Sequence, residues 1–201
     1  MPVAVERWWR NAAIALIAAM LFAGLTTGQA FAEVYADETR STDPNKAQIM
    51  AMAKDLALIP RIFGCEFAWG QVIGPHSITL EFVPKTDDVR KWTRLFTITT
   101  FELPPKQDAQ RALITRLQTL TLANFSNRGT VTNKKQGEDR AKMPTVTFEY
   151  ELGEGAAKEY GVAGIYKARP NLALIVQYQL RTPLAKTDAA KMNDLAMPTP
   201  N

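Results

Sequence analysis

Histidine and cysteine are almost missing from this chain, because His76 and Cys65 are the only residues of their types among 201. One thiol cannot form an internal disulfide, so the chain is not a disulfide-stabilised scaffold. Cys65 lies in an apolar stretch, where we expect a small buried side chain; intermolecular pairing or a reactive thiol is the alternative. One His and one Cys eleven residues apart do not make a zinc site. We therefore expect no metal and no cofactor.

Long apolar runs are also scarce, and the run Ala12–Leu25 has only 14 residues. A membrane-spanning helix needs about 20. Arg7 and Arg10 precede this run, and Ala30-Phe31-Ala32 follows it with small residues at the −3 and −1 positions. This order is typical of a secretory signal peptide, and a retained membrane anchor is the alternative. We predict cleavage after Ala32, no membrane span in the mature protein, and a periplasmic or secreted location.

Excess charge of one sign is slight, since the chain has 24 basic and 20 acidic residues. Removing residues 1–32 leaves 22 basic and 19 acidic residues, a net charge of +3. Nucleic-acid-binding proteins usually gather far more positive charge on one face. We therefore expect a mixed-charge, solvated surface and no nucleic-acid partner, with weak attraction to an anionic surface as the alternative.

Hydrophobic spacing predicts a polar, flexible lead over residues 33–45, then one domain over residues 46–196, and a tail over residues 197–201. Asn45 is the expected N-cap of the first helix, and Pro60 is expected to end it. The expected helices are Lys46–Leu58, Asp108–Phe125 and Thr187–Ala196. The expected strands are Cys65–Val72, Ile78–Val83, Trp92–Leu103, Thr130–Lys134, Thr145–Leu152, Tyr160–Ala168 and Leu172–Leu180.

The helix over Asp108–Phe125 is the clearest of these elements, with Asp108 as a plausible N-cap and Gly129 just beyond its end. Its apolar stripe is expected to be Ala109, Ala112, Leu113, Leu117 and Leu120. We predict that Leu113, Leu117 and Leu120 pack on a sheet containing Phe148, Tyr150, Val176 and Tyr178.

Clustered strands between separated helices indicate an α+β fold, in which helices flank an antiparallel β-sheet. The short connections between the later strands favour hairpins. Both faces of the strand Leu172–Leu180 carry apolar side chains, so we expect helices on both faces of the sheet.

Element order and aromatic placement carry a resemblance to a known group. The strand Trp92-Thr93-Arg94-Leu95-Phe96 precedes a long amphipathic helix, and hairpins containing FEY and YGVAGIY follow. Over Lys46–Ala196 this arrangement resembles the PsbP/Mog1-like α/β/α sandwich, whose members are mostly non-enzymatic accessory proteins. No motif matches residue by residue, so no functional residue is transferred. A cystatin-like or nuclear-transport-factor-like cone is the structural alternative.

Two groups of side chains are candidate binding sites. Trp92 stands at a strand entrance beside Arg90 and Arg94, an aromatic and cationic combination that interfaces favour; the alternative is a core tryptophan. Lys134, Lys135 and Arg140 belong to a basic loop that is a candidate patch for a partner or a lipid headgroup, and a solvated hairpin is the alternative. Aromatic residues do not interleave with this loop as nucleic-acid platforms require.

Catalytic chemistry would have to use His76, which we expect in an exposed turn. Ser77 cannot face it from a regular strand. Glu149 and Glu151 share a strand face, which is the expected solvated face of an antiparallel sheet. Asp87 and Asp88 lack the sequence around them that an EF-hand calcium site has. The sequence thus favours a non-enzymatic exported accessory or binding protein with an unidentified protein partner. A periplasmic hydrolase using His76 and acidic residues is the alternative.

Overall fold

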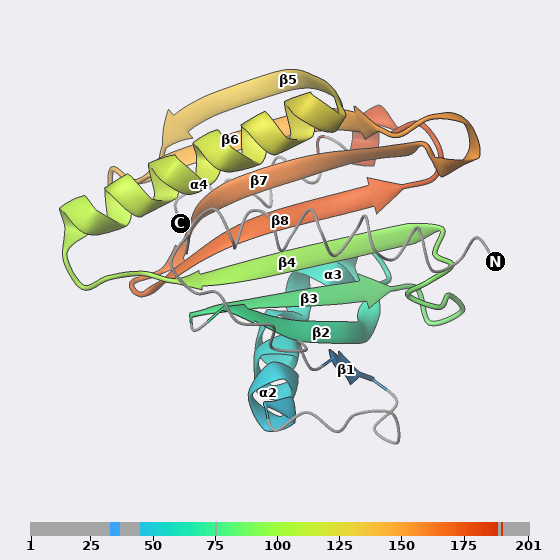
Figure 1. Ribbon diagram of the computed structural model, residues 1–201, viewed down its shortest axis with the longest axis horizontal. Coiled ribbons are helices and arrows are strands. Elements are labelled where there is room, and N and C mark those ends of the chain that lie inside the picture. The colour runs from blue at the N-terminus through green and yellow to red at the C-terminus, as the bar shows by residue number, and fades with distance from the viewer. Residues whose placement is uncertain (1–32, 37–44, 75, 189, 191–201) are drawn as a thin grey trace.

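The computed structural model describes residues 33–36, 45–74, 76–188 and 190. Eight strands in this part of the chain form one antiparallel sheet, and helices α2, α3 and α4 pack on it (Figure 1). The strands are β1 (Glu33–Tyr35), β2 (Glu66–Gly74), β3 (Ser77–Val83), β4 (Arg94–Glu102), β5 (Gly129–Glu138), β6 (Pro144–Leu152), β7 (Glu159–Arg169) and β8 (Leu172–Leu180). The helices are α2 (Lys46–Leu56), α3 (Leu58–Ile62) and α4 (Gln107–Arg128), with a 3-10 turn at Gly155–Ala157.

The strand order is β1-β2-β3-β4-β8-β7-β6-β5. Each half of the sheet is a run of sequence neighbours, and the halves join where β4 pairs antiparallel with β8. Helix α4 carries the chain from the middle of the sheet to its far edge, because it follows β4 and precedes the edge strand β5. The start of β4 and the end of β8 therefore lie side by side, with Arg94 opposite Leu180.

Side-chain alternation along β8 gives the sheet two buried faces. Leu174 and Val176 belong to a core cluster with α2 and α3, whereas Ala173 and Ile175 belong to a second cluster with α4. In Figure 1, α4 lies in front of β6 and β7, and α3 lies behind β3 and β4. The predicted α+β fold with an antiparallel sheet is confirmed, and the two core clusters involve α2 and α3 in one case and α4 in the other.

The buried face of α4 differs from the predicted stripe. Ala109 and Ala112 are exposed and Leu120 is only half-buried, although Leu117 is fully buried as predicted. The buried residues are Gln110, Ile114, Leu117, Gln118, Thr121 and Phe125. Two glutamines enter this face because their side-chain amides find backbone acceptors. Gln110 Nε2 donates to the carbonyls of Pro104 and Pro170 at 2.7 and 2.9 Å, and Gln118 Nε2 donates to Ile165 at 3.5 Å. A hydrogen-bonded amide can be buried at little cost.

The predicted partners of α4 are half correct. Phe148 and Tyr150 of β6 pack in the α4 cluster, with the Phe125 ring centroid 5.2 and 4.5 Å from theirs. Val176 and Tyr178 instead pack in the α2–α3 cluster. Antiparallel register aligns Phe148 with Ala163 and Gln177, so the α4 face of β8 carries the odd-numbered residues.

The amino-terminal predictions need correction at two points. Residues 33–35, expected in the flexible lead, form strand β1 paired with β2. Pro60 does not end the first helix: α2 stops at Leu56, and Pro60 lies in the first turn of the short helix α3, where its missing N–H is tolerated. Asn45 precedes α2 but makes no side-chain cap hydrogen bond. Residues 37–44 of the lead lie outside the described residues.

Later boundaries also shift. The first residue of α4 is Gln107, so Asp108 lies in its first turn rather than at the N-cap. Strand β5 is twice as long as the predicted Thr130–Lys134, and β4 begins at Arg94, after Trp92. The predicted helix Thr187–Ala196 falls mostly outside the described residues, as do the signal peptide and the tail. No helix in the described part of the chain is long and apolar enough to cross a membrane.

Candidate functional site

A pocket of about 630 Å³ opens at the end of the sheet where β4 starts and β8 stops. Four segments line it: the end of α3 and Gly64, the start of β4, the end of β8, and the chain that follows β8. Its walls hold two guanidinium groups and three aromatic rings. We call it the arginine pocket, and its lining residues are Ile62, Phe63, Gly64, Trp92, Thr93, Arg94, Tyr178, Leu180, Arg181, Thr182, Pro183, Ala185 and Asp188.

A fixed loop brings Trp92 and Thr93 to the pocket. The Asp87 carboxylate accepts hydrogen bonds from the Thr93 backbone N–H at 2.6 Å and from the Thr93 hydroxyl at 2.7 Å. These bonds, the backbone one above all, hold the pKa of Asp87 below its usual value. Asp88 Oδ1 accepts the Arg90 N–H at 2.8 Å. Both carboxylates therefore serve the loop, and no group of three or more metal-ligating side chains occurs among the described residues.

Trp92 lies at the back of the pocket, only 4% exposed, and packs with Val83 and Leu95. The cation over its ring is Arg181, whose Cζ lies 4.2 Å from the ring centroid. Arg181 also forms an ion pair with Glu159 at 3.2 Å and donates to the Ala157 carbonyl at 3.3 Å. Trp92 is thus both a core residue and part of a cation–π pair.

Arg94 is the second guanidinium of the pocket. Its Nη1 donates to the Phe63 carbonyl at 3.3 Å, and it is close enough to Tyr178 to hydrogen-bond the phenol. Among the described residues, no carboxylate lies within ion-pair distance of Arg94. The acidic residue among the lining residues is Asp188, whose charge also raises the pKa of Tyr178. Burial, the main cause, raises the pKa of Tyr178 to about 12. The phenol is neutral at physiological pH, so it offers Arg94 an uncharged hydrogen-bond acceptor.

Cys65 lies just behind the pocket wall, fully buried, with its thiol 3.8 Å from the Phe63 carbonyl. Burial raises the pKa of the thiol to about 11, so it carries no thiolate at neutral pH. A thiol in this state is unreactive. The prediction of a small buried side chain is confirmed.

Two large apolar side chains on α3 are exposed beside the pocket, Leu58 at 73% and Ile62 at 44%. They are four residues apart, so they project from the same side of the helix. Ile62 also forms part of the pocket rim. Adjacent exposed apolar side chains at a pocket mark interaction surfaces more often than isolated ones do.

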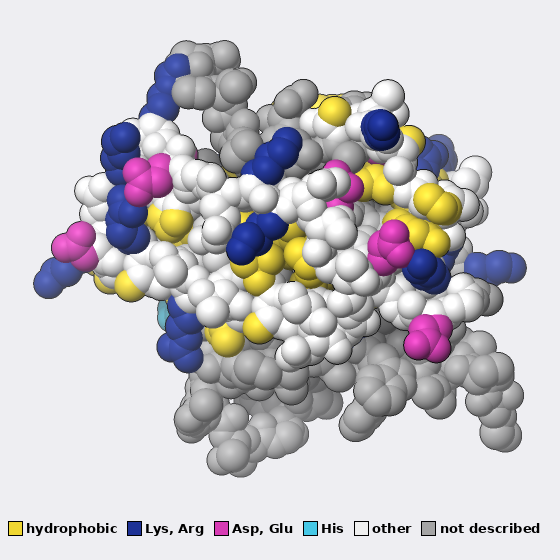
Figure 2. Space-filling model, turned by 90° about the horizontal axis from the view of Figure 1, so that it is seen from above, with side chains coloured by type: hydrophobic (Ala, Val, Ile, Leu, Met, Phe, Trp, Pro, Cys, Tyr) yellow, Lys and Arg dark blue, Asp and Glu magenta, His cyan; other side chains and the backbone are white. Residues whose placement is uncertain are grey.

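The other predicted site residues lie elsewhere. Arg90 belongs to the loop before β4 and does not line the pocket. Lys134 and Lys135 are not in a loop, because they lie on the exposed edge strand β5, and Arg140 follows in the β5–β6 hairpin. Figure 2 shows the face that includes this edge, where Lys and Arg side chains are spread among Asp and Glu. Lysines and a break in register, between Thr132 and Lys135, are features that protect sheet edges from pairing.

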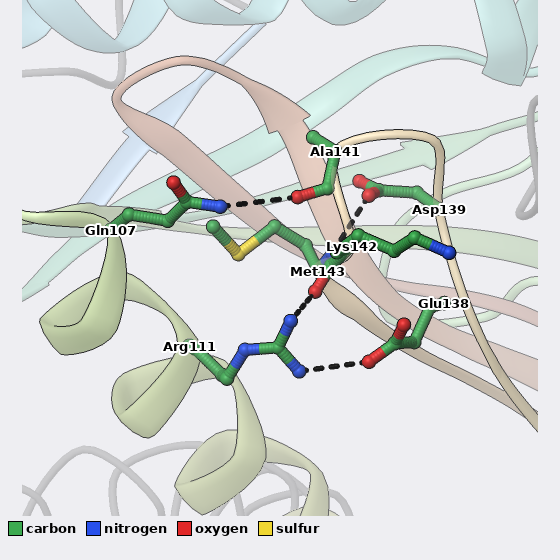
Figure 3. A network of polar contacts seen from close by, with 7 residues as sticks. All are labelled: Gln107, Arg111, Glu138, Asp139, Ala141, Lys142 and Met143. Carbon is green, nitrogen blue, oxygen red and sulfur yellow. Dashed lines mark hydrogen bonds and ion pairs between the residues drawn. The ribbon is translucent and has the colours of Figure 1, made fainter.

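The β5–β6 hairpin is held by α4 (Figure 3). Arg111 Nη1 binds Glu138 at 2.9 Å, and its Nη2 donates to the Lys142 carbonyl. Within the hairpin, Asp139 Oδ1 accepts the Met143 N–H at 2.8 Å, and Met143 is fully buried. These contacts anchor the hairpin to the core and give it a structural role.

His76 has an acidic partner in an open position. Its Nδ1 lies 2.7 Å from Glu102 Oε2, and both side chains are 60% exposed. The neighbouring Ser77 hydroxyl is buried and makes no hydrogen bond within the described part of the chain. Glu151 pairs with Lys158 at 2.7 Å, and Glu149 accepts from Asn133 at 2.9 Å. His76 does not line the arginine pocket, so the imidazole and the pocket are separate features.

Of the residues that line the pocket, Trp92 and Arg94 were singled out from the sequence as candidates, but Arg181, Tyr178 and Asp188 were not. Arg181 was detectable in part, because it directly follows the strand predicted at Leu172–Leu180. Its position beside Thr93 depends on the pairing of β4 with β8, which at this end joins Arg94 to Leu180, 86 residues later in the chain. Comparison with models of known protein families and with curated proteins gives no match for this chain.

Proposed function

We propose that this chain is an exported, non-enzymatic accessory or binding protein that acts through protein–protein interaction. Its contact area, here called the docking surface, consists of the arginine pocket together with Leu58 and Ile62. One observation carries the proposal: the exposed apolar pair of α3 adjoins a pocket that combines Trp92 with two guanidinium groups. Buried aromatic and arginine side chains next to apolar ones are the usual anchors of protein interfaces.

Export and fold group belong to the same proposal. The positive start, the 14-residue apolar run and Ala30-Phe31-Ala32 support a signal peptide cleaved after Ala32 and a periplasmic or secreted location. Helices on both faces of an antiparallel sheet support an α/β/α sandwich similar to the PsbP/Mog1 group. Membership of that group would agree with an accessory role.

The docking surface can be tested by site-specific crosslinking in cells. A photoreactive amino acid replaces Leu58 in one variant and Ala112 in the control. Ala112 is exposed on α4, on the opposite face of the sheet. We expect a discrete adduct with one protein from position 58 and none from position 112. Adducts of equal yield from both positions, or none from position 58, would contradict the proposal.

A second candidate, a periplasmic hydrolase, is favoured by the His76–Glu102 contact of 2.7 Å. A carboxylate that orients an imidazole is a common element of acid–base catalysis. Both groups are exposed, however, and no nucleophile contacts His76 within the described residues. Loss of a measurable hydrolytic activity in His76→Ala, with the fold retained by circular dichroism, would favour the enzyme over the accessory role.

A further inference from the structure

We infer that the arginine pocket binds the carboxylate of an acidic residue in a partner segment that is otherwise apolar. This inference rests on the proposed function and specifies the chemistry of the partner. Arg94 is the anchor, because its guanidinium lines the pocket and donates to a carbonyl and a phenol rather than to a carboxylate of the described residues. Arg94 is exposed, so an incoming group can reach it.

Arg181 has a supporting role. It is already paired with Glu159 and stacked on Trp92, which fixes the position of its guanidinium. Little of its charge remains for a ligand, and its guanidinium covers one face of the buried indole. We therefore assign Arg94 to direct contact with the ligand and Arg181 to positioning of Trp92.

The charge balance favours a carboxylate over a phosphate. Glu159 pairs with Arg181 and Asp188 lies in the pocket wall, so these two carboxylates balance the two guanidinium groups. A dianionic phosphate therefore meets more repulsion from Asp188 than a monoanionic carboxylate does. The planar guanidinium also matches a carboxylate with two parallel hydrogen bonds. A polyanion would need a continuous basic surface.

Apolar flanking residues follow from the walls of the pocket. Phe63 and Tyr178 form part of its floor, with ring centroids 4.5 Å apart, and Ile62 forms part of its rim. Leu58 lies one helical turn from Ile62 and is largely in solvent. A partner segment with bulky apolar residues on either side of one acid would cover these side chains while its carboxylate meets Arg94.

Peptide titrations of the exported protein, followed by NMR, test this pairing. The probes are the N-acetylated, C-amidated pentapeptide Leu-Ala-Glu-Ala-Leu and two versions with glutamine or phosphoserine at the centre. We expect the glutamate peptide to bind about tenfold more tightly than the glutamine peptide, the range of a charged hydrogen bond. Tightest binding by the phosphoserine peptide, equal binding of all three, or no binding of the glutamate peptide would overturn the inference.

Matched variants link the preference to Arg94. Arg94→Ala should remove the glutamate preference, and Arg94→Lys, which keeps the charge, should retain part of it. Arg116→Ala changes the net charge equally at an exposed position of α4 and should retain all of it. A preference that survives in Arg94→Ala, or is lost in Arg116→Ala, would contradict the inference. If the crosslink from position 58 forms in the natural protein and persists in Arg94→Ala at full yield, only the carboxylate inference fails. If the natural protein forms no crosslink from position 58, the proposed function itself fails.

Discussion

Burial of two ionisable side chains next to the pocket links stability to alkaline pH. Inside the protein neither the Cys65 thiolate nor the Tyr178 phenolate is solvated, so burial raises the pKa of the thiol to about 11 and that of the phenol to about 12. In the unfolded chain both groups have ordinary pKa values, so the unfolded state loses its protons first as pH rises. The stabilising contribution of Cys65 is complete below a pH of about 8.5 and is lost as pH approaches 11.

The consequence for Cys65 can be measured with urea melts at a series of pH values. From about pH 8 to about pH 10, we expect the free energy of unfolding of the natural protein to fall by ~1–2 kcal/mol more than that of Cys65→Ala. The variant retains Tyr178, so the difference between the two slopes belongs to the thiol. Parallel pH profiles would mean that Cys65 ionises normally and is not enclosed.

At the scale of elements, substitutions in α4 test which side of this helix packs on the sheet. Leu117 is fully buried in the α4 cluster, so Leu117→Ala should lower the free energy of unfolding by about 2–5 kcal/mol. Leu120 is half-buried, so Leu120→Ala should lower the free energy of unfolding by clearly less than Leu117→Ala does. Arg116→Ala, at an exposed position, should cost well under ~1 kcal/mol. Urea melts of the three variants compare these values, and equal losses at Leu117 and Leu120 would place the helix in the predicted orientation instead.

Elements were predictable where one face is apolar, as β3 and β6 show. The orientation of α4 was not predictable, because glutamine side chains such as Gln110 and Gln118 are usually exposed. Their burial here depends on carbonyl acceptors in other segments, at Pro170 and Ile165. The same limit applies to β1: three residues reveal no period, and their strand conformation depends on pairing with β2. Local pattern predicts which segments are regular, whereas contacts distant in sequence decide what they face.

For the whole molecule, the predicted cleavage of the signal peptide determines which residues the exported protein contains. We predict a mature amino terminus at Glu33, which is also the first residue of β1, so cleavage after Ala32 would leave this strand intact. Intact-mass measurement of the protein recovered from the exported fraction checks the cleavage. A full-length mass, with the protein retained in the membrane fraction, would contradict the signal peptide and favour the anchor.

The pocket is a property of the whole sheet. Trp92 and Arg94 attract notice in the sequence because an aromatic residue and cations are adjacent. Arg181 and Tyr178 join them only through the β4–β8 pairing, which closes the sheet between its two halves. The basic residues Lys134, Lys135 and Arg140 attract notice for the same reason but lie along the β5 edge and its hairpin.

The most direct test of the docking surface is a map of amide chemical shifts during titration with the glutamate pentapeptide. Three regions compete: the docking surface, the basic β5 edge and the His76–Glu102 pair. We predict that the perturbed amides fall in residues 58–64, 92–94 and 178–188, the segments that form the pocket and the α3 pair. Perturbation centred on Lys134, Lys135 and Arg140, or on His76 and Glu102, would contradict the assignment of the docking surface.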